Sequence, residues 1–364
     1  MIRTVFHAAT LSLCAAALFP STAAAETTLP PTVTMVVGSA AGGGFDKYGR
    51  LTAKYLKQYL PGQPSIVVQN MPGAGGIKSL TWLYNTAEKD GKHFALISAA
   101  SAFAPLIVDR PIPYDPPKFT YLISLNKLNN MLLVWHTTPF HRADQIFKQE
   151  MILGNSSGPS AIIPAMMNRL VGTKFKVIGG YKGTNNMALA IENGEVQGSI
   201  NYEWDSITGS RTDWLNNKKI RIIMQMTMEP VNDPLLKGIP FIGSYVTDPE
   251  SRDILEILLA KQKLGRPFMG PPGMAPDAVA TYRTALTKTV KDPTFLRAAE
   301  ASRISINPVS GEELTVFMKR IYSIPESTIR KMREEIKLAE KGIVKRKDKG
   351  KGKGKGKKKS DVPG

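Results

Sequence analysis

The hydrophobic positions of the chain alternate between two spacings. Residues 32–37 are all β-branched or apolar and run into a glycine-rich stretch, which is typical of a buried strand and its turn. Over 45–59 the apolar side chains return every three or four positions between lysines and arginines, which predicts an amphipathic helix that stops at 61–62. A second strand, glycine-rich turn and helix are predicted over 66–87, and a third strand over 93–98. The chain therefore begins with successive strand–turn–helix units.

The same alternation continues downstream. An N-cap, a proline and an acid at Asp248–Glu250 predict the start of one helix, Pro276 the start of another, and a capping box at Ser310–Glu313 that of a third. Pro325 should kink or split this last helix. Repeated β-α units favour an α/β fold with mostly parallel sheets between helices. The further predicted elements are strands at 151–153, 175–178, 196–200 and 220–225, and helices at 160–171 and 184–193.

Charge and cysteine content limit the class of protein. The net charge is +18, and residues 345–364 hold ten Lys or Arg and two Asp, so this Lys/Gly-rich tail supplies +8 of it. We therefore expect no specific nucleic-acid partner, and the tail is predicted to be disordered. The alternative to a tail without a specific role is a tail that is attracted to anionic lipid or to another polyanion. The chain has one cysteine, which excludes a disulfide scaffold, and its 364 residues suggest about two domains.

The first 25 residues have the order of a secretion signal. Arg3 precedes an apolar run over 5–19, and small residues follow up to Ala25. This run is too short for a permanent membrane helix, and the small residues predict cleavage before Glu26. We therefore expect a periplasmic protein.

Two glycine-rich loops, at 38–44 and 72–76, each join a predicted strand to a predicted helix. A helix start offers unpaired N–H groups and the positive end of the helix dipole, and glycine lets a ligand approach them closely. The pair indicates a site for a carboxylate or phosphate, and the alternative is that the glycines only permit tight turns. Neither loop has the residues of a nucleotide motif, so no cofactor is expected.

Gly154–Gly158 matches the Gly-x-Ser-x-Gly turn of serine hydrolases, with Ser156 in the place of the nucleophile. That turn requires a histidine after the serine, whereas the histidines here all precede it, so we expect no enzyme and keep a hydrolase as the alternative. No metal site is predicted. Asp46 and Asp205 suit helix caps, and Tyr181 and Trp204 suit either packing or lids over a ligand. The histidines are His7, His93, His136 and His141.

Several short motifs occur together in a specific order. The sequence resembles the periplasmic substrate-binding proteins of tripartite tricarboxylate transporters, the Bug-type receptors, over about residues 33–340. The motifs that carry the resemblance are Gly42-Gly43-Gly44-Phe45-Asp46, Asn70-Met71-Pro72-Gly73-Ala74-Gly75-Gly76, Pro113-Tyr114-Asp115, Tyr181-Lys182-Gly183, Gly194-Glu195-Val196-Gln197 and Asp292-Pro293.

The resemblance implies a two-lobed type II binding-protein fold whose lobes close on a ligand. Residues 26–131 and 265–344 would form the first lobe and 132–264 the second. The chain would cross between them near Leu132–Trp135 and Arg266–Met269. We expect a monomer that captures a small carboxylated compound and delivers it to membrane permease subunits. The identity of the ligand and of the permease stays open.

The resemblance also implies the ligand-binding residues. Backbone amides of the first two loops would hold a carboxylate, and the third loop and the second lobe would face the same cleft. Ile200-Asn201 stands where the family often has Phe-Asp. The missing negative charge would change which distal group of the ligand the site accepts. The expected ligand-binding residues are Ala40, Gly43, Gly44, Asp46, Gly75, Gly76, Ser98, Ser101, Asn155, Ser156, Ser157, Tyr181 and Asn201.

Overall fold

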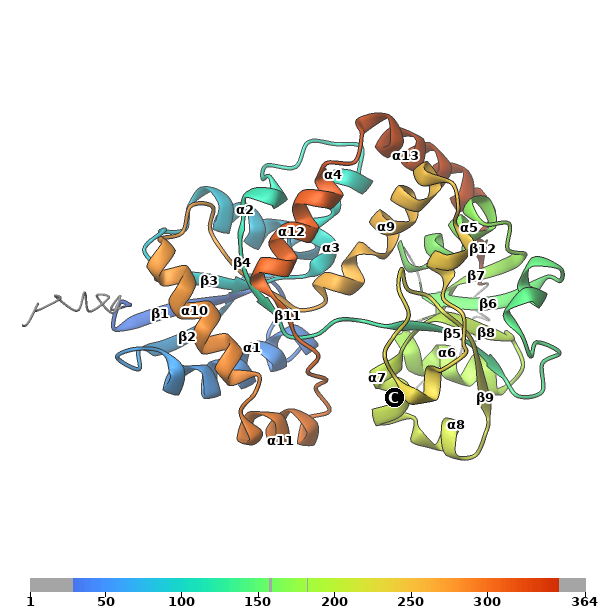
Figure 1. Cartoon of the computed structure of the whole chain (residues 1–364), viewed down its shortest axis with the longest axis horizontal. Coiled ribbons are helices and arrows are strands. Elements are labelled where there is room, and N and C mark those ends of the chain that lie inside the picture. The colour runs from blue at the N-terminus through green and yellow to red at the C-terminus, as the bar shows by residue number, and fades with distance from the viewer. Residues whose placement is uncertain (1–28, 157–158, 182, 347–364) are drawn as a thin grey trace, which may run out of the picture.

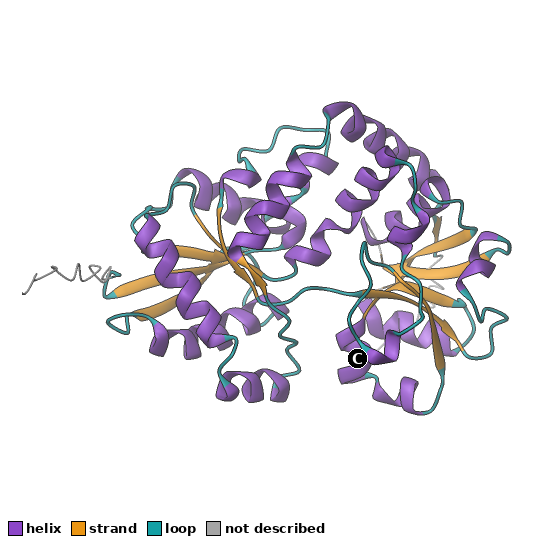
Figure 2. Ribbon diagram, viewed as in Figure 1, coloured by secondary structure: helices purple, strands orange, loops and turns teal. Residues whose placement is uncertain are grey.

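Two six-stranded sheets, each between layers of helices, form two lobes that lie side by side (Figures 1 and 2). The computed structural model describes residues 29–156, 159–181 and 183–346. The predicted secretion signal, Ser157 and most of the Lys/Gly-rich tail lie outside these residues. In the described part, no helix is long and apolar enough to cross a membrane.

The first sheet has the strand order β11-β4-β10-β3-β1-β2. Its first three strands run parallel, as the sequence predicts, but β10 returns antiparallel between β3 and β4. The sheet is therefore mixed, because the chain re-enters this lobe from the second one. The strands are β1 (Thr32–Val37), β2 (Ser65–Asn70), β3 (His93–Leu96), β4 (Thr120–Ser124), β10 (Pro267–Gly270) and β11 (Val309–Ser310).

The helices of the first lobe cover both faces of its sheet. Side chains of α1, α10 and α11 share one apolar core with β1 and β3, while α2 and α12 belong to the other. The predicted cap at Ser310 is present, with its Oγ accepting the N–H of Glu313 at 3.1 Å. These helices are α1 (Gly44–Leu56), α2 (Ile77–Asn85), α3 (Ala99–Ala102), α4 (Ala104–Ile107), α10 (Pro276–Thr289), α11 (Pro293–Ala301) and α12 (Gly311–Tyr322).

The second sheet has the order β12-β7-β6-β8-β5-β9 and is also mixed, because β5 runs against both of its neighbours. Its strands are β5 (Asn130–Trp135), β6 (Met151–Ser156), β7 (Phe175–Tyr181), β8 (Gly198–Glu203), β9 (Ile220–Gln225) and β12 (Val344–Lys345). The helices around it are α5 (Pro159–Leu170), α6 (Gly183–Glu192), α7 (Trp204–Ser210), α8 (Thr212–Asn216), α9 (Pro249–Leu264) and α13 (Glu326–Lys341).

The C-terminal segment differs from the expected division into lobes. The resemblance implies that residues 265–344 belong to the first lobe, yet α13 packs on α5 and α9, and β12 pairs with β7 of the second sheet. Figure 1 shows α13, in red, reaching over the top of both lobes. The helix itself is strongly amphipathic, but its sequence does not specify which lobe covers its apolar face. The break predicted at Pro325 is confirmed, since α12 ends at Tyr322 and α13 begins at Glu326.

One apolar core joins the lobes on the side of α9, α12 and α13. Leu80 of the first lobe and Met166 of the second belong to the same continuous cluster, which includes Leu258 of α9 and Met332 of α13. Separation of the lobes on this side would expose apolar surface, at about 25 cal/mol per Å². Relative motion of the lobes is therefore expected to open the opposite side, where α7 and α11 face one another (Figure 1).

In each sheet, the carboxyl ends of the parallel strands lie where the chain crosses between the lobes. In the first lobe the end of β3 pairs with the start of β10, which follows the crossing at 265–266. In the second, the end of β8 at Glu203 pairs with Asn130, which follows the crossing at 125–129. This crossing precedes the expected one at Leu132–Trp135, which lies within β5. Ligands of α/β proteins bind beyond the carboxyl ends of parallel strands. The cleft between the lobes therefore receives the strand–helix turns of both.

Gly265, at the second crossing, is predicted to contribute strongly to stability because no other residue fits there. Its φ is 44°, and a Cβ there would lie 1.6 Å from the carbonyl oxygen of Asn126. We expect Gly265→Ala to lower the free energy of unfolding by about 3 kcal/mol or more. At Gly62, where φ is 71° and no atom lies within 4 Å, Gly62→Ala should cost only about 1 kcal/mol. Urea denaturation measures both, and equal losses would contradict the steric argument.

Candidate functional site

The turn after β1 is held to the turn after β2 by Asp46. This carboxylate accepts the N–H of Gly42 at 2.8 Å and a bond from Asn70 Nδ2 at 2.9 Å, and Arg50 Nε lies 3.0 Å away. Asn70 also donates to the carbonyl of Ser39 at 3.0 Å. Asp46 is 4% exposed, and its oxygens are occupied within the protein. The structure thus gives it a positioning role, and ligand contact by Asp46 itself stays a prediction.

This network lowers the pKa of Asp46 to about 2. The hydrogen bond from Arg50 is the largest cause, and the N–H of Gly42 and the amide of Asn70 add to it against the opposing effect of burial. The carboxylate therefore keeps its negative charge, and the first loop keeps its shape, at any physiological pH.

The second and third loops of the first lobe lie in contact. Gly75 and Gly76 have φ of 66° and 101°, so both use the left-handed region that favours glycine. A Cβ on Gly76 would lie 3.0 Å from the Oγ of Ser101, whose hydroxyl donates to the carbonyl of Ser98 at 2.6 Å. Four expected ligand-binding residues, Gly75, Gly76, Ser98 and Ser101, are therefore neighbours.

The glycines of the first two loops leave backbone open. At Gly44 and Gly75 no atom lies within 4 Å of an added Cβ, and Ala40, Gly43 and Gly44 are exposed. No side chain caps α1 at Gly43. The N–H groups of this helix start are consequently free for an anion, which is the condition that the sequence argument required.

In the second lobe, Asn155 and Asn201 lie together at the carboxyl ends of β6 and β8. The amide of Asn201 donates to Oδ1 of Asn155, which is fully buried. Nδ2 of Asn155 has no partner among the described residues. A buried amide without a partner costs about 1–3 kcal/mol, so this donor is a candidate for a ligand oxygen. Ser156 ends β6 beside it, and Ser157 lies outside the described residues.

Tyr181 is packed in the core of the second lobe. It is 1% exposed, its hydroxyl donates to Glu195 at 2.9 Å, and the guanidinium of Arg346 lies 4.9 Å from its ring centre. Of the two interpretations of Tyr181, packing is the one that this geometry supports, and ligand contact stays a prediction.

Two cavities lie between the lobes. One, of about 730 Å³, has the α11 region on one wall and α7 on the other, and a second of about 400 Å³ reaches Asn201 and the start of α6. The hydroxyl of Ser305 donates to Asp205 across the cleft, and the carbonyl of Ser305 accepts from Tyr48 at 2.9 Å. Further lining residues that the sequence did not indicate are Asn126, Glu203, Ser206, Ser210, Arg266 and Arg303. They come from segments that meet only in the folded chain.

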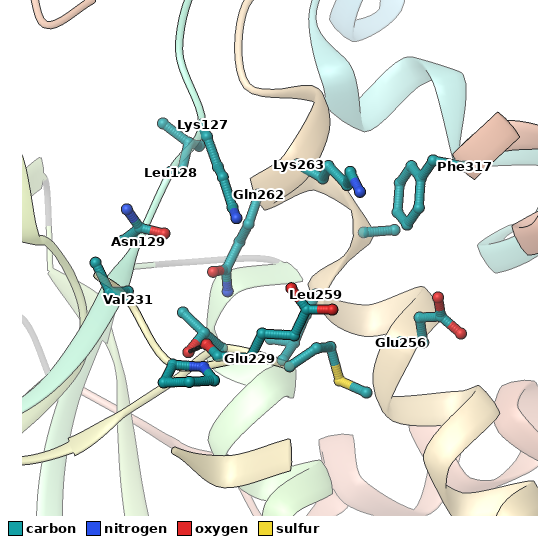
Figure 3. Close-up of a pocket in the computed structure, with 14 residues that line it drawn as sticks. Lys127, Leu128, Asn129, Glu229, Val231, Glu256, Leu259, Gln262, Lys263 and Phe317 are labelled. Carbon is teal, nitrogen blue, oxygen red and sulfur yellow. Dashed lines mark hydrogen bonds between the residues drawn. The ribbon is translucent and has the colours of Figure 1, made fainter. Parts of the chain in front are cut away.

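A smaller pocket, of about 130 Å³, lies between the crossing at 127–129, α9 and the segment after β9 (Figure 3). Lys127, Asn129 and Gln262 line one part of it, and Lys263 of α9 and Phe317 of α12 lie at the other end. The Nε2 of Gln262 already donates to the carbonyl of Met226 at 2.9 Å. This pocket belongs to the hinge rather than to the cleft.

The hydrolase alternative meets a geometric difficulty. Ser156 lies at the edge of the second sheet where β8 ends, whereas His136 follows β5, whose end pairs with the start of β8. His136, and His141 after it, therefore follow the opposite edge of this sheet, and His93 lies in the first. Within the described ranges, no group of three or more His, Cys, Asp or Glu could hold a metal ion.

The Asp46 network makes a pH-dependent contribution to stability. Because its folded pKa lies below the ordinary value of 3.8, the contribution is present above about pH 4 and is lost as the pH falls toward 2. We expect Asp46→Asn to lower the free energy of unfolding by about 1 kcal/mol at pH 7. This loss is smaller than the pKa shift alone would give, because Arg50 is exposed and solvent screens its charge.

Urea unfolding at several pH values measures this loss. The difference between Asp46→Asn and the unmodified protein should shrink as the pH falls from 5 toward 2. Asp109→Asn, at an exposed acid whose ion pair with Lys337 is open to solvent, is the matched control and should change the free energy of unfolding by under about 0.5 kcal/mol. A loss for Asp46→Asn that stays constant over this range would contradict the assignment.

Comparison with solved structures finds the same architecture. The chain matches a TctC solute-binding protein from Polaromonas with a TM-score of 0.63 and 19% identity, over 82% of this chain and 98% of that one. It matches MatC from Rhodopseudomonas palustris with bound malate at a TM-score of 0.52 and 17% identity, over 85% and 100% of the two chains. Another R. palustris protein, with adipate, gives a TM-score of 0.53 and 19% identity over 87% and 100%.

Sequence comparison agrees with this. A UPF0065 protein from the gbd 5′ region of Cupriavidus necator is 24% identical over 331 residues, which is 86% of this chain and 95% of that protein. No family profile matches the chain. The chain has the two-lobed fold of the TctC-type solute-binding proteins, and its resemblance to the substrate-binding proteins of tripartite tricarboxylate transporters is confirmed.

Proposed function

We propose that this protein is a periplasmic receptor that holds a small carboxylated compound between its lobes and delivers it to a membrane permease. The observation that carries the proposal is the open, uncapped backbone at Gly43, Gly44 and Gly75, at the edge of the first sheet that faces the cleft. The structural neighbours with malate and adipate support a carboxylate as the ligand. The order of residues 1–25 supports export to the periplasm, with cleavage after Ala25.

Binding would combine fixed donors with movement of the lobes. The N–H groups at the start of α1 carry partial positive charge and need no reorganisation to accept a carboxylate. Asn155 and Asn201 would reach the same ligand from the second lobe once the cleft narrows. Since binding involves contacts from both walls, the ligand favours the closed arrangement by its higher affinity for it. A receptor of this kind performs no covalent step, and a monomer suffices.

Calorimetric titration of the mature protein against linear monocarboxylates and dicarboxylates tests the proposal. We expect at least one to bind with a micromolar or lower Kd and to raise the unfolding temperature, because a ligand of the folded state stabilises it. Absence of binding across the series, together with unchanged thermal stability, would overturn the proposed function.

Gly44→Glu separates the site from the fold. An acidic side chain at the first residue of α1 is favourable for the helix and meets no atom within 4 Å, so stability should change by under about 1 kcal/mol. The same carboxylate would repel a ligand anion, and we expect affinity to fall at least tenfold.

Lys47→Glu is the matched control, since Lys47 is exposed and lies one turn further along the same helix. Lys47→Glu changes the net charge more than Gly44→Glu does, yet it should weaken ligand binding less than threefold. Equal losses for the two variants would indicate general electrostatic attraction in place of a site at the helix start.

A further inference from the structure

The larger cavity of the cleft has walls of opposite charge. Arg266 and Arg303 line it from the first lobe, and Glu203 and Asp205 line it from the second. Glu203 and Arg303 also line the smaller cavity, so they stand where the two cavities meet. A ligand in this space would have cations on one side and carboxylates on the other.

Polar groups on these walls lack partners among the described residues. Glu203 ends β8 in a half-buried position and makes no hydrogen bond or ion pair there, and the charges of Arg266 and Lys261 act on it from farther away. Asn126 is 2% exposed, and its Oδ1 accepts no hydrogen bond. Nε of Arg266 is buried and donates none. Buried polar atoms are normally satisfied, so the Oδ1 of Asn126 and the Nε of Arg266 require an explanation.

The Nε donor of Arg266, which has no hydrogen-bond acceptor, lies on the side of the glycine loops. The guanidinium of Arg266 is 4.6 Å from the ring centre of Phe45 and 5.3 Å from that of Tyr48, and Phe45 directly follows Gly44. Arg266 therefore borders the start of α1, where the proposed function places the carboxylate of the ligand. The unfilled acceptors, on Glu203 and Asn126, belong to the end of β8 and to the crossing.

We propose that the cleft selects a carboxylate that also carries a cationic nitrogen, such as an amino acid, with Glu203 and Asn126 accepting its N–H groups. This inference rests on the proposed function and specifies the ligand class. A protonated amine satisfies both acceptors, which a second carboxylate of a diacid cannot do. A diacid would instead place a negative charge beside Glu203, where burial already disfavours the ionised acid.

The test uses the full mature chain and three probe series of three to six carbons: the straight-chain monocarboxylates, the dicarboxylates and the ω-amino carboxylates. We expect an ω-amino carboxylate to bind at least tenfold more tightly than the monocarboxylate and the dicarboxylate of the same length. Glu203→Gln should reduce this advantage to within threefold, with a loss of ω-amino carboxylate affinity that exceeds any change in monocarboxylate affinity. Glu300→Gln, which removes an exposed acid that lines the same cavity, should leave the tenfold preference intact.

The outcomes distinguish the inference from the proposed function. Binding of dicarboxylates more tightly than ω-amino carboxylates would overturn the inference and keep the receptor. The same holds for an amine preference that survives Glu203→Gln. Absence of binding by all three series would overturn both. Equal unfolding temperatures of Glu203→Gln and the unmodified protein, within a few degrees, establish that the variant is folded.

Discussion

A backbone N–H at the start of a helix has no partner within that helix, and this constraint underlies the whole site. Among the described helices α9, α11 and α12 meet it with a side chain, as Asp248 does for Ser251 at the start of α9. At α1 the N-cap is Gly43, and the nearest acid, Asp46, is occupied by its own loop. The backbone N–H groups at the start of α1 therefore have no capping side chain, and an anion is a suitable partner for them.

The two-lobed fold determines where such an anion can be held. Parallel strands deliver their turns to a shared edge, and the strand pairing around the crossings brings the edges of both sheets to one cleft. The apolar core along α9, α12 and α13 keeps the lobes together on one side. Rotation about the crossing segments would change the width of the cleft where Asp205 meets Ser305.

Local patterns predicted the local structure well. The strand at 32–37 and the helix start at Pro276 are confirmed, because spacing and capping act over a few residues. The antiparallel strand β10 and the position of α13 could not be predicted, since each depends on which distant surface covers an apolar face. The glycine loops were visible as motifs, whereas Glu203 and Arg266 carry no local signal and gain meaning only where the lobes meet.

The most direct measurement is a spectrum of amide resonances from protein labelled with ¹⁵N-glycine, recorded during titration with a carboxylate that binds. The account predicts that the signals of Gly43, Gly44 and Gly75 move downfield with one shared Kd, while that of Gly62 stays in place. Saturable binding that leaves these three signals unmoved would contradict the claim that the open helix starts hold the ligand.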